Sequence, residues 1–265
     1  ALSTILSTSL EYSIMHLLCT IYIILRTICS VNQIIAIIIH TKIYFLRTIL
    51  LSEDVIMKHA REAYENGKAR FPVELKRCAL LVIDMQDEFV KPGWTSSWIP
   101  EATRQVGKIK EIISFCREKN VPVIYTVFSK TNNYLDRPVS GQYMPNRFPE
   151  LGDDQSWFSE GKVWHELAPR EDEIVIHKPS YGAFYDTPLD TILKRMRKDT
   201  VIICGTLTNC CCGTTARQAY ERNYYVVFGS DITSTYDMQM QEAELNILRF
   251  AFARVMAAEE IMGIK

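Results

Sequence analysis

From Cys78 onward, short apolar runs alternate with segments in which apolar residues recur every three or four positions. Each short run has the length of a strand, and each periodic segment has the pattern of a helix with one buried face. The first run, Ala79–Ile83, is apolar throughout, which is typical of a strand buried on both faces. This alternation predicts an α/β fold, with a Rossmann-like parallel six-stranded sheet flanked by helices.

The same pattern gives the bounds of the predicted elements. The six strands are Ala79–Ile83, Val121–Phe128, Glu173–Ile176, Val201–Cys204, Tyr225–Phe228 and Arg254–Ala257. The main helices are Glu101–Asn120, Pro188–Lys198, Cys211–Asn223 and Gln241–Arg254. Between the second and third strands, Ser129–Pro169 shows no clean period and contains four of the ten prolines. We predict that it is an excursion over the rim of the sheet, where binding loops usually lie.

Residues 1–56 differ from the rest because they carry only six charged side chains. We therefore divide the chain into an apolar N-terminal extension, residues 1–56, and a domain, residues 57–265. Arg26 separates two apolar stretches, Tyr12–Leu25 and Thr27–Ile39, and neither has the roughly 18 apolar residues of a membrane span. A membrane helix stays an open alternative, although we do not expect a membrane as partner, and we expect no secretory signal. Three interpretations stay open: an extension before a natural start at Met57, a membrane-associated anchor, or a helical hairpin packed on the domain or a partner subunit.

Charge and cysteine usage limit the class of partner. The formal net charge of -1 provides no basic field for nucleic acid, so we expect a small-molecule partner instead. The eight cysteines form neither CxxC pairs nor a disulfide framework, which indicates free thiols and a reducing, cytoplasmic location. Cys210, Cys211 and Cys212 are adjacent and have no second ligand motif, so we predict no zinc site.

Two charged residues come directly at the ends of predicted strands. Ligands of open parallel sheets bind at the carboxyl ends of the strands, so these positions are the first catalytic candidates. Asp84 follows the first strand, and a buried carboxylate there needs a partner. Lys178 follows the third strand, whereas His177 faces the opposite side of the sheet because strand side chains alternate. A turn residue and an exposed lysine are the ordinary alternatives for either residue alone.

A cysteine lies where the fourth strand leads into a helix. We expect Thr208 or Asn209 to cap this helix, which puts Cys211 in its first turn. Exposed N–H groups and the helix dipole favour a thiolate at that position.

Three motifs occur in the order IDMQDEF (83–89), HKPSYGAF (177–184) and GTLTNCCCGTTARQA (205–219). Together they resemble the isochorismatase-like cysteine hydrolases, and the resemblance covers roughly residues 78–260. It implies a hydrolase domain with a catalytic triad of Asp84, Lys178 and Cys211, in which Cys211 occupies the cysteine of the TNxC pattern. It implies no cofactor, and it leads us to expect a homodimer or homotetramer.

The resemblance also implies a mechanism, in which the cysteine attacks a carbonyl carbon and passes through a thioester while the aspartate moves protons. The backbone N–H groups of Leu207 and Cys211 are implied to form an oxyanion hole, next to a cis peptide between Thr206 and Leu207. The nucleophile favours hydrolysis of a C–N bond in a small amide, ureide or carbamoyl compound.

The implied substrate site includes Phe89, Phe128 and Tyr185, for which core packing is the other interpretation. Residues 181–190 are similar to the corresponding stretch of ureidoacrylate amidohydrolases, which favours a linear ureide or carbamoyl substrate. Residues 128–133 read FSKTNN and lack the Asp-x-His group of metal-dependent nicotinamidases. We therefore expect no metal and consider nicotinamide disfavoured.

Three alternatives stay open. The first is hydrolysis of a vinyl ether, as in isochorismatases proper, and the second is a non-catalytic binding protein with the same fold. The third is a papain-like pair of a cysteine with His165 or His177.

Overall fold

The computed structural model describes residues 20, 23, 31–50, 52–66, 71–129, 135, 136, 138 and 161–264. It divides into two compact units, Ala1–Arg61 and Glu62–Lys265, and each is described here by itself. The predicted boundary between residues 56 and 57 falls within helix α3 (Glu53–Asn66), so that boundary stays a prediction.

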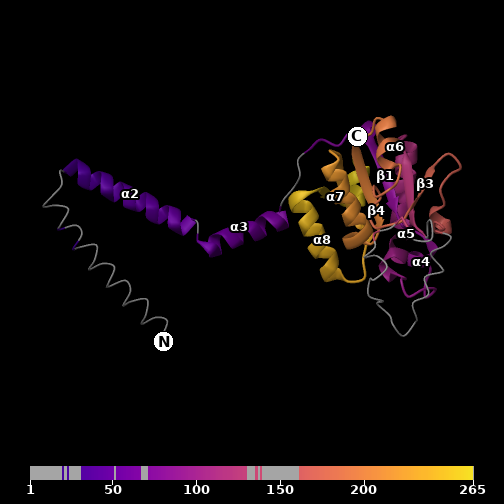
Figure 1. Cartoon of the computed structure of the whole chain (residues 1–265), viewed down its shortest axis with the longest axis horizontal. Helices are drawn as coiled ribbons and strands as arrows, with labels where there is room; N and C mark the ends of the chain where they lie inside the picture. Colours follow the sequence, from indigo (N-terminus) through magenta and orange to yellow (C-terminus); the bar gives the residue numbers. More distant parts are fainter. Residues whose placement is uncertain are drawn as a thin grey trace. The chain divides into compact units, whose positions relative to one another are not determined.

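The first unit contains helix α2 (Val31–Leu50) and the beginning of α3 (Figure 1). Several apolar side chains of α2 are exposed, among them Ile39, Tyr44 and Phe45. Among the described residues, no single helix has the length and hydropathy of a membrane span. Two consecutive helical segments, Ile35–Thr48 and Glu53–Glu62, reach that length and hydropathy together, but the chain bends between them. Most of the two predicted apolar stretches lies outside the described residues.

The second unit is built on a six-stranded parallel sheet. Its strands are β1 (Cys78–Ile83), β2 (Val123–Phe128), β3 (Ile174–Lys178), β4 (Thr200–Thr206), β5 (Tyr225–Ser234) and β6 (Arg254–Met256). They are arranged in the order β3-β2-β1-β4-β5-β6, and all neighbouring strands are parallel. This confirms the predicted fold class. Every residue of the central strand β1 is buried, as a strand covered by helices on both faces requires.

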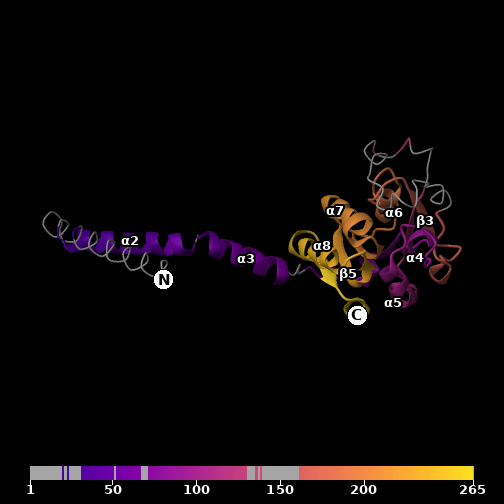
Figure 2. The same ribbon diagram turned by 90° about the horizontal axis from the view of Figure 1, so that it is seen from below.

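Helices cover both faces of this sheet (Figures 1 and 2). They are α4 (Asp87–Val90), α5 (Pro100–Glu118), α6 (Leu189–Arg195), α7 (Gly213–Glu221), α8 (Met238–Ala251) and α9 (Ala258–Met262), with 3₁₀ turns at Leu75–Arg77 and His165–Leu167. Helices α5 and α9 pack on one face, where Leu80, Val82 and Tyr125 contribute to the core. Helices α6, α7 and α8 pack on the other face, against Leu81, Ile83 and neighbouring residues.

Four predicted element boundaries were wrong by three residues or more: the end of β5, both ends of α8 and the end of α6. Strand β5 continues to Ser234, beyond the predicted end at Phe228, although Gly229, Ser230 and Asp231 are poor strand formers. Pairing with β4 carries it through a register shift between Ile203 and Gly205. Helix α8 begins at Met238 instead of Gln241, because the Asp237 carboxylate accepts hydrogen bonds from the next turn.

The register of the sheet brings the predicted site residues together at the carboxyl ends of the strands. Ile83, the residue before Asp84, pairs with Thr126 of β2 and with Gly205 of β4. Phe128 pairs with Lys178 at the end of β3. Most of the predicted excursion Ser129–Pro169 lies outside the described residues, which resume at Gly161.

Candidate active site

Asp84 turns sharply out of β1 with a φ of 49°, a left-handed conformation that aspartate tolerates better than most residues. Its backbone N–H donates to the carbonyl of Thr126 at 3.1 Å. Its carboxylate oxygen Oδ1 accepts a hydrogen bond from the Thr126 hydroxyl at 2.7 Å. Both residues are completely buried, so strand β2 fixes the position of this carboxylate.

Lys178 is also completely buried, and it forms an ion pair with Asp84, Nζ to Oδ2, at 2.7 Å. The ammonium group donates to the carbonyl of Ser180 at 2.8 Å and lies 5.0 Å from the centre of the Phe128 ring. Burial alone lowers the pKa of Lys178, but the negative charge of Asp84 and the proximity of Cys211 outweigh it, so the net shift is upward. The lysine is therefore a cation at neutral pH.

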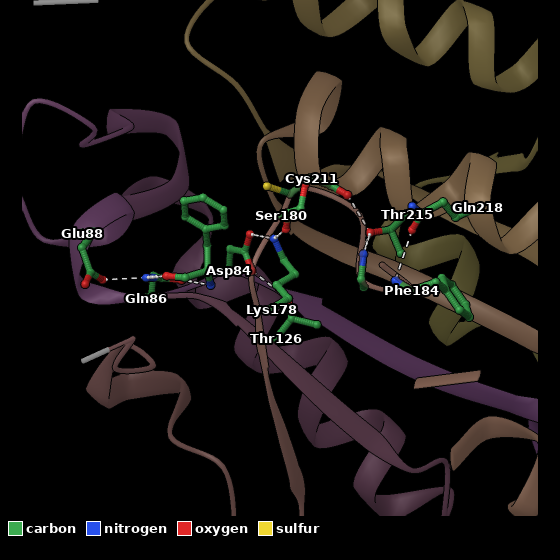
Figure 3. A network of polar contacts seen from close by, with 12 residues as sticks. Asp84, Gln86, Glu88, Thr126, Lys178, Ser180, Phe184, Cys211, Thr215 and Gln218 are labelled. Carbon is green, nitrogen blue, oxygen red and sulfur yellow. Dashed lines mark hydrogen bonds and ion pairs between the residues drawn. The ribbon is translucent and has the colours of Figure 1, made fainter. Parts of the chain in front are cut away.

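Cys211 completes the cluster, and its side chain interacts with both Asp84 and Lys178. Figure 3 shows these three side chains meeting from three separate segments of the chain. Cys211 is 4% exposed, and this burial raises the pKa of the thiol, although the Lys178 charge acts in the opposite direction. The resting site thus holds a protonated thiol beside an ion pair, and not the thiolate that the helix dipole alone predicts.

A π-helical turn, Thr208–Cys212, carries the cysteine into α7. The Thr206–Leu207 peptide bond before it is cis, and the carbonyl of Leu207 accepts the N–H groups of Cys210 and Cys212. The predicted helix caps were wrong, because no side chain caps this turn or α7. Thr208 is the first residue of the helical turn itself. A capping side chain has to come before the exposed N–H groups of a helix, and Thr208 does not. The oxyanion role of the Leu207 and Cys211 N–H groups stays a prediction.

Helix α7 ties the cysteine to the segment that follows Lys178. The Thr215 hydroxyl donates to the carbonyl of Cys211 at 2.7 Å and accepts the N–H of Ala183 at 2.9 Å. The Gln218 side chain accepts the N–H of Phe184 at 3.1 Å (Figure 3). The residues after Lys178 and the residue that bears the thiol are therefore held by one rigid helix.

The three predicted substrate-binding aromatics lie in different environments. Phe89 is buried in the core, whereas Phe128 and Tyr185 are half-buried. Phe128 stacks on Tyr181, with ring centres 6.2 Å apart, and Tyr181 is 39% exposed. Tyr181 is thus an additional candidate for contact with a ligand, and the roles of Phe89, Phe128 and Tyr185 stay predictions.

Sequence reasoning missed three supporting residues, which are Thr126, Gln86 and Thr215. Gln86 exchanges two hydrogen bonds with the backbone of Phe128, at 2.7 and 2.9 Å, and donates to Glu88 at 2.8 Å. A polar side chain within an otherwise apolar strand, as at Thr126, is the signal that points to such a role.

Neither histidine of the papain-like alternative contacts the cysteine. His177 is exposed and hydrogen-bonds to Ser129 at 3.1 Å, and His165 is exposed and packs on Trp164. Within the described part of the chain, no three His, Cys, Asp or Glu side chains are grouped as metal ligands. A cavity of about 730 Å³, lined by residues that include Asp199 and Tyr225, lies at the opposite ends of β4 and β5 and touches none of the three site residues.

Comparison with known proteins gives concordant results. Residues 78–260 match the family model for the isochorismatase domain. The chain is 31% identical to nicotinamidase 3 of Arabidopsis thaliana over 186 residues, which cover 70% of this chain and 87% of that protein. Among solved structures, a cysteine hydrolase from Pseudomonas syringae pv. phaseolicola is 27% identical with a TM-score of 0.66, covering 74% of this chain and 95% of that one. N-carbamoylsarcosine amidase from Thermoplasma acidophilum is 29% identical with a TM-score of 0.57, covering 71% and 99%.

Proposed function

The chain belongs to the isochorismatase family, a family of hydrolases with amidase members, and from that premise we propose that it hydrolyses a C–N bond through Cys211. The observation that carries the proposal is the buried Asp84–Lys178 ion pair at 2.7 Å, which interacts with the Cys211 thiol. A buried ion pair is weak evidence for stability but strong evidence for chemistry when a nucleophile adjoins it.

The first proposed step is attack on the substrate carbonyl. The proton of the Cys211 thiol passes to Asp84 as the sulfur bonds to the carbonyl carbon, so a free thiolate is not required beforehand. The carbonyl oxygen becomes an oxyanion, and we assign its stabilisation to the N–H groups of Leu207 and Cys211. Lys178 remains a cation throughout and stabilises the negative charge that has left the carboxylate.

The second step breaks the C–N bond. Asp84 returns its proton to the departing nitrogen, and a thioester on Cys211 remains. A water molecule then attacks the thioester and gives its proton to Asp84. When the second tetrahedral intermediate collapses, the sulfur leaves and regains that proton, which restores the resting site.

A small ureide or carbamoyl compound is the substrate class we favour. Supporting this choice are the motif in residues 181–190 and the similarity to an N-carbamoylsarcosine amidase. The chain is also similar to a nicotinamidase. Residues 128–133, however, lack the Asp-x-His group of metal-dependent nicotinamidases.

An ammonia-release screen over ureides, N-carbamoyl amino acids and simple amides tests the proposal, with Cys211→Ser as the control. We expect at least one class to release ammonia and the Ser variant to lose nearly all of this activity. Turnover of a vinyl ether that persists in Cys211→Ser would favour the isochorismatase-type alternative. If no compound is turned over and the Cys211 thiol reacts no faster with iodoacetamide than the other thiols, the non-catalytic alternative stands.

A further inference from the structure

The two carboxylate oxygens of Asp84 have different surroundings. Oδ1 accepts a hydrogen bond of 2.7 Å from the Thr126 hydroxyl. Oδ2 lies 2.7 Å from Nζ of Lys178, and the Cys211 side chain also interacts with Asp84. One oxygen is thus occupied by a neutral donor, and the other adjoins the cation with a lone pair still available for a proton.

Thr126 holds Asp84 at two points. Its carbonyl accepts the Asp84 N–H at 3.1 Å, while its hydroxyl donates to the carboxylate. The Thr126 side chain is completely buried in β2, and a hydroxyl has a single proton to donate. The backbone turn and the rotation of the carboxylate are therefore fixed by the same residue.

The opposing cation is fixed in a similar way. Lys178 donates one of its three protons to the carbonyl of Ser180 at 2.8 Å, and its ammonium group lies 2.7 Å from Oδ2 of Asp84 and interacts with Cys211. The charged groups that face Asp84 are accordingly Lys178 and, once ionised, Cys211.

We propose that Thr126 is a positioning residue that occupies Oδ1 of Asp84, so that Oδ2 alone exchanges the proton with the Cys211 thiol and with the leaving nitrogen. The inference rests on the proposed function. In the first exchange the S–H bond breaks and an O–H bond forms at Oδ2, and in the second that O–H bond breaks as an N–H bond forms. Without the Thr126 hydroxyl, the carboxylate can rotate, and the proton that it has taken from the thiol then points away from the leaving nitrogen.

Three variants test this role with the substrate that the ammonia-release screen identifies. Thr126→Val removes the hydroxyl and keeps the shape and the preference for a strand, and Thr126→Ser restores the donor. Thr200→Val is the matched control, because Thr200 is also buried in the sheet but its hydroxyl bonds to Asp199, away from the site. For each protein, kcat and KM are measured from pH 5 to 10, together with thermal unfolding.

Thr126→Val is expected to lower kcat roughly ten- to a hundredfold while KM changes less than about threefold, because a hydrogen bond to a charged group is lost at the step of proton transfer. Thr126→Ser should recover most of kcat, and Thr200→Val should behave as the wild type.

Three results would overturn the inference. One is a folded Thr126→Val protein with wild-type kcat, and another is a folded Thr126→Ser protein as impaired as Thr126→Val. A crystal structure of Thr126→Val that shows the Asp84 carboxylate unmoved would count equally against it. Failure of the proposed function is distinguishable, because activity would then survive in Cys211→Ser, or no compound of the screen would be turned over, whatever the residue at position 126.

Discussion

Replacing one member of the buried ion pair is expected to destabilise the fold far more than replacing both. Asp84 and Lys178 are 0% exposed, so Lys178→Met leaves a carboxylate with no counter-charge in the interior. The expected loss is about 3 to 5 kcal/mol, which corresponds to a fall in melting temperature of roughly 6 to 20 °C for a domain of this size. The double variant Asp84→Asn/Lys178→Met has no unpaired charge and is expected to recover most of that loss.

Urea unfolding followed by tryptophan fluorescence measures this difference. All four tryptophans lie between residues 94 and 164, within the unit Glu62–Lys265, so the signal reports on that unit. The coupling between the two substitutions is obtained from a double-mutant cycle. Strictly additive losses, or a loss below about 1 kcal/mol for Lys178→Met, would refute the reasoning that the two charges compensate each other in the folded state.

The same pair predicts how stability changes at alkaline pH. The pKa of Lys178 is raised in the folded state, so its contribution is fully present below the unfolded value of 10.5 and is lost as the pH rises through the folded value. Stability of the wild type should therefore decline above about pH 10.5, and the double variant should lack this component of the decline.

Three further predictions concern the residues around the thiol. Because burial raises the pKa of Cys211, its alkylation by iodoacetamide should accelerate steadily from pH 6 to 9, and a flat profile by mass spectrometry would indicate a preformed thiolate instead. Gly205→Ala should destabilise by several kcal/mol in urea, because its φ is 117° and a Cβ would overlap the carbonyl of Ile83; Gly93→Ala, with positive φ but open space, should cost about 1 kcal/mol. Thr215→Val should lower both stability, by about 1 to 3 kcal/mol, and kcat, since it loses bonds on both sides of the site; unchanged kcat would show that this link is structural only.

Much of the fold could be predicted because the hydrophobic pattern of each helix and strand is a local property of the sequence. The apolar run before Asp84 predicted a strand buried on both faces, which β1 is, and the carboxyl ends of parallel strands lie on the same side of a sheet. Strand β5 was predicted too short because its second half depends on pairing with β4 across a register shift, which no local propensity records.

The fine structure of the site was less predictable, because it depends on contacts between distant segments. Thr126 looks like an ordinary strand residue until the register places it beside Asp84, 42 positions earlier in the chain. The protonated state of Cys211 follows from burial, which the sequence does not show, and this outweighs the helix dipole that the sequence does suggest. The stacking of Tyr181 on Phe128 likewise requires the two strand ends to be neighbours.

Conservation of charge explains why a site so fully buried suits the proposed reaction. The resting cluster holds one cation, Lys178, one anion, Asp84, and a neutral thiol. When the thiol proton moves to the carboxylate, the negative charge moves to the sulfur and then to the substrate oxygen, but the total charge does not change. The carboxylate and the sulfur both interact with the same ammonium group, so transfer of the proton between them does not leave an unpaired buried charge. Low polarity, which is costly for an isolated ion, then strengthens every interaction that the moving charge makes.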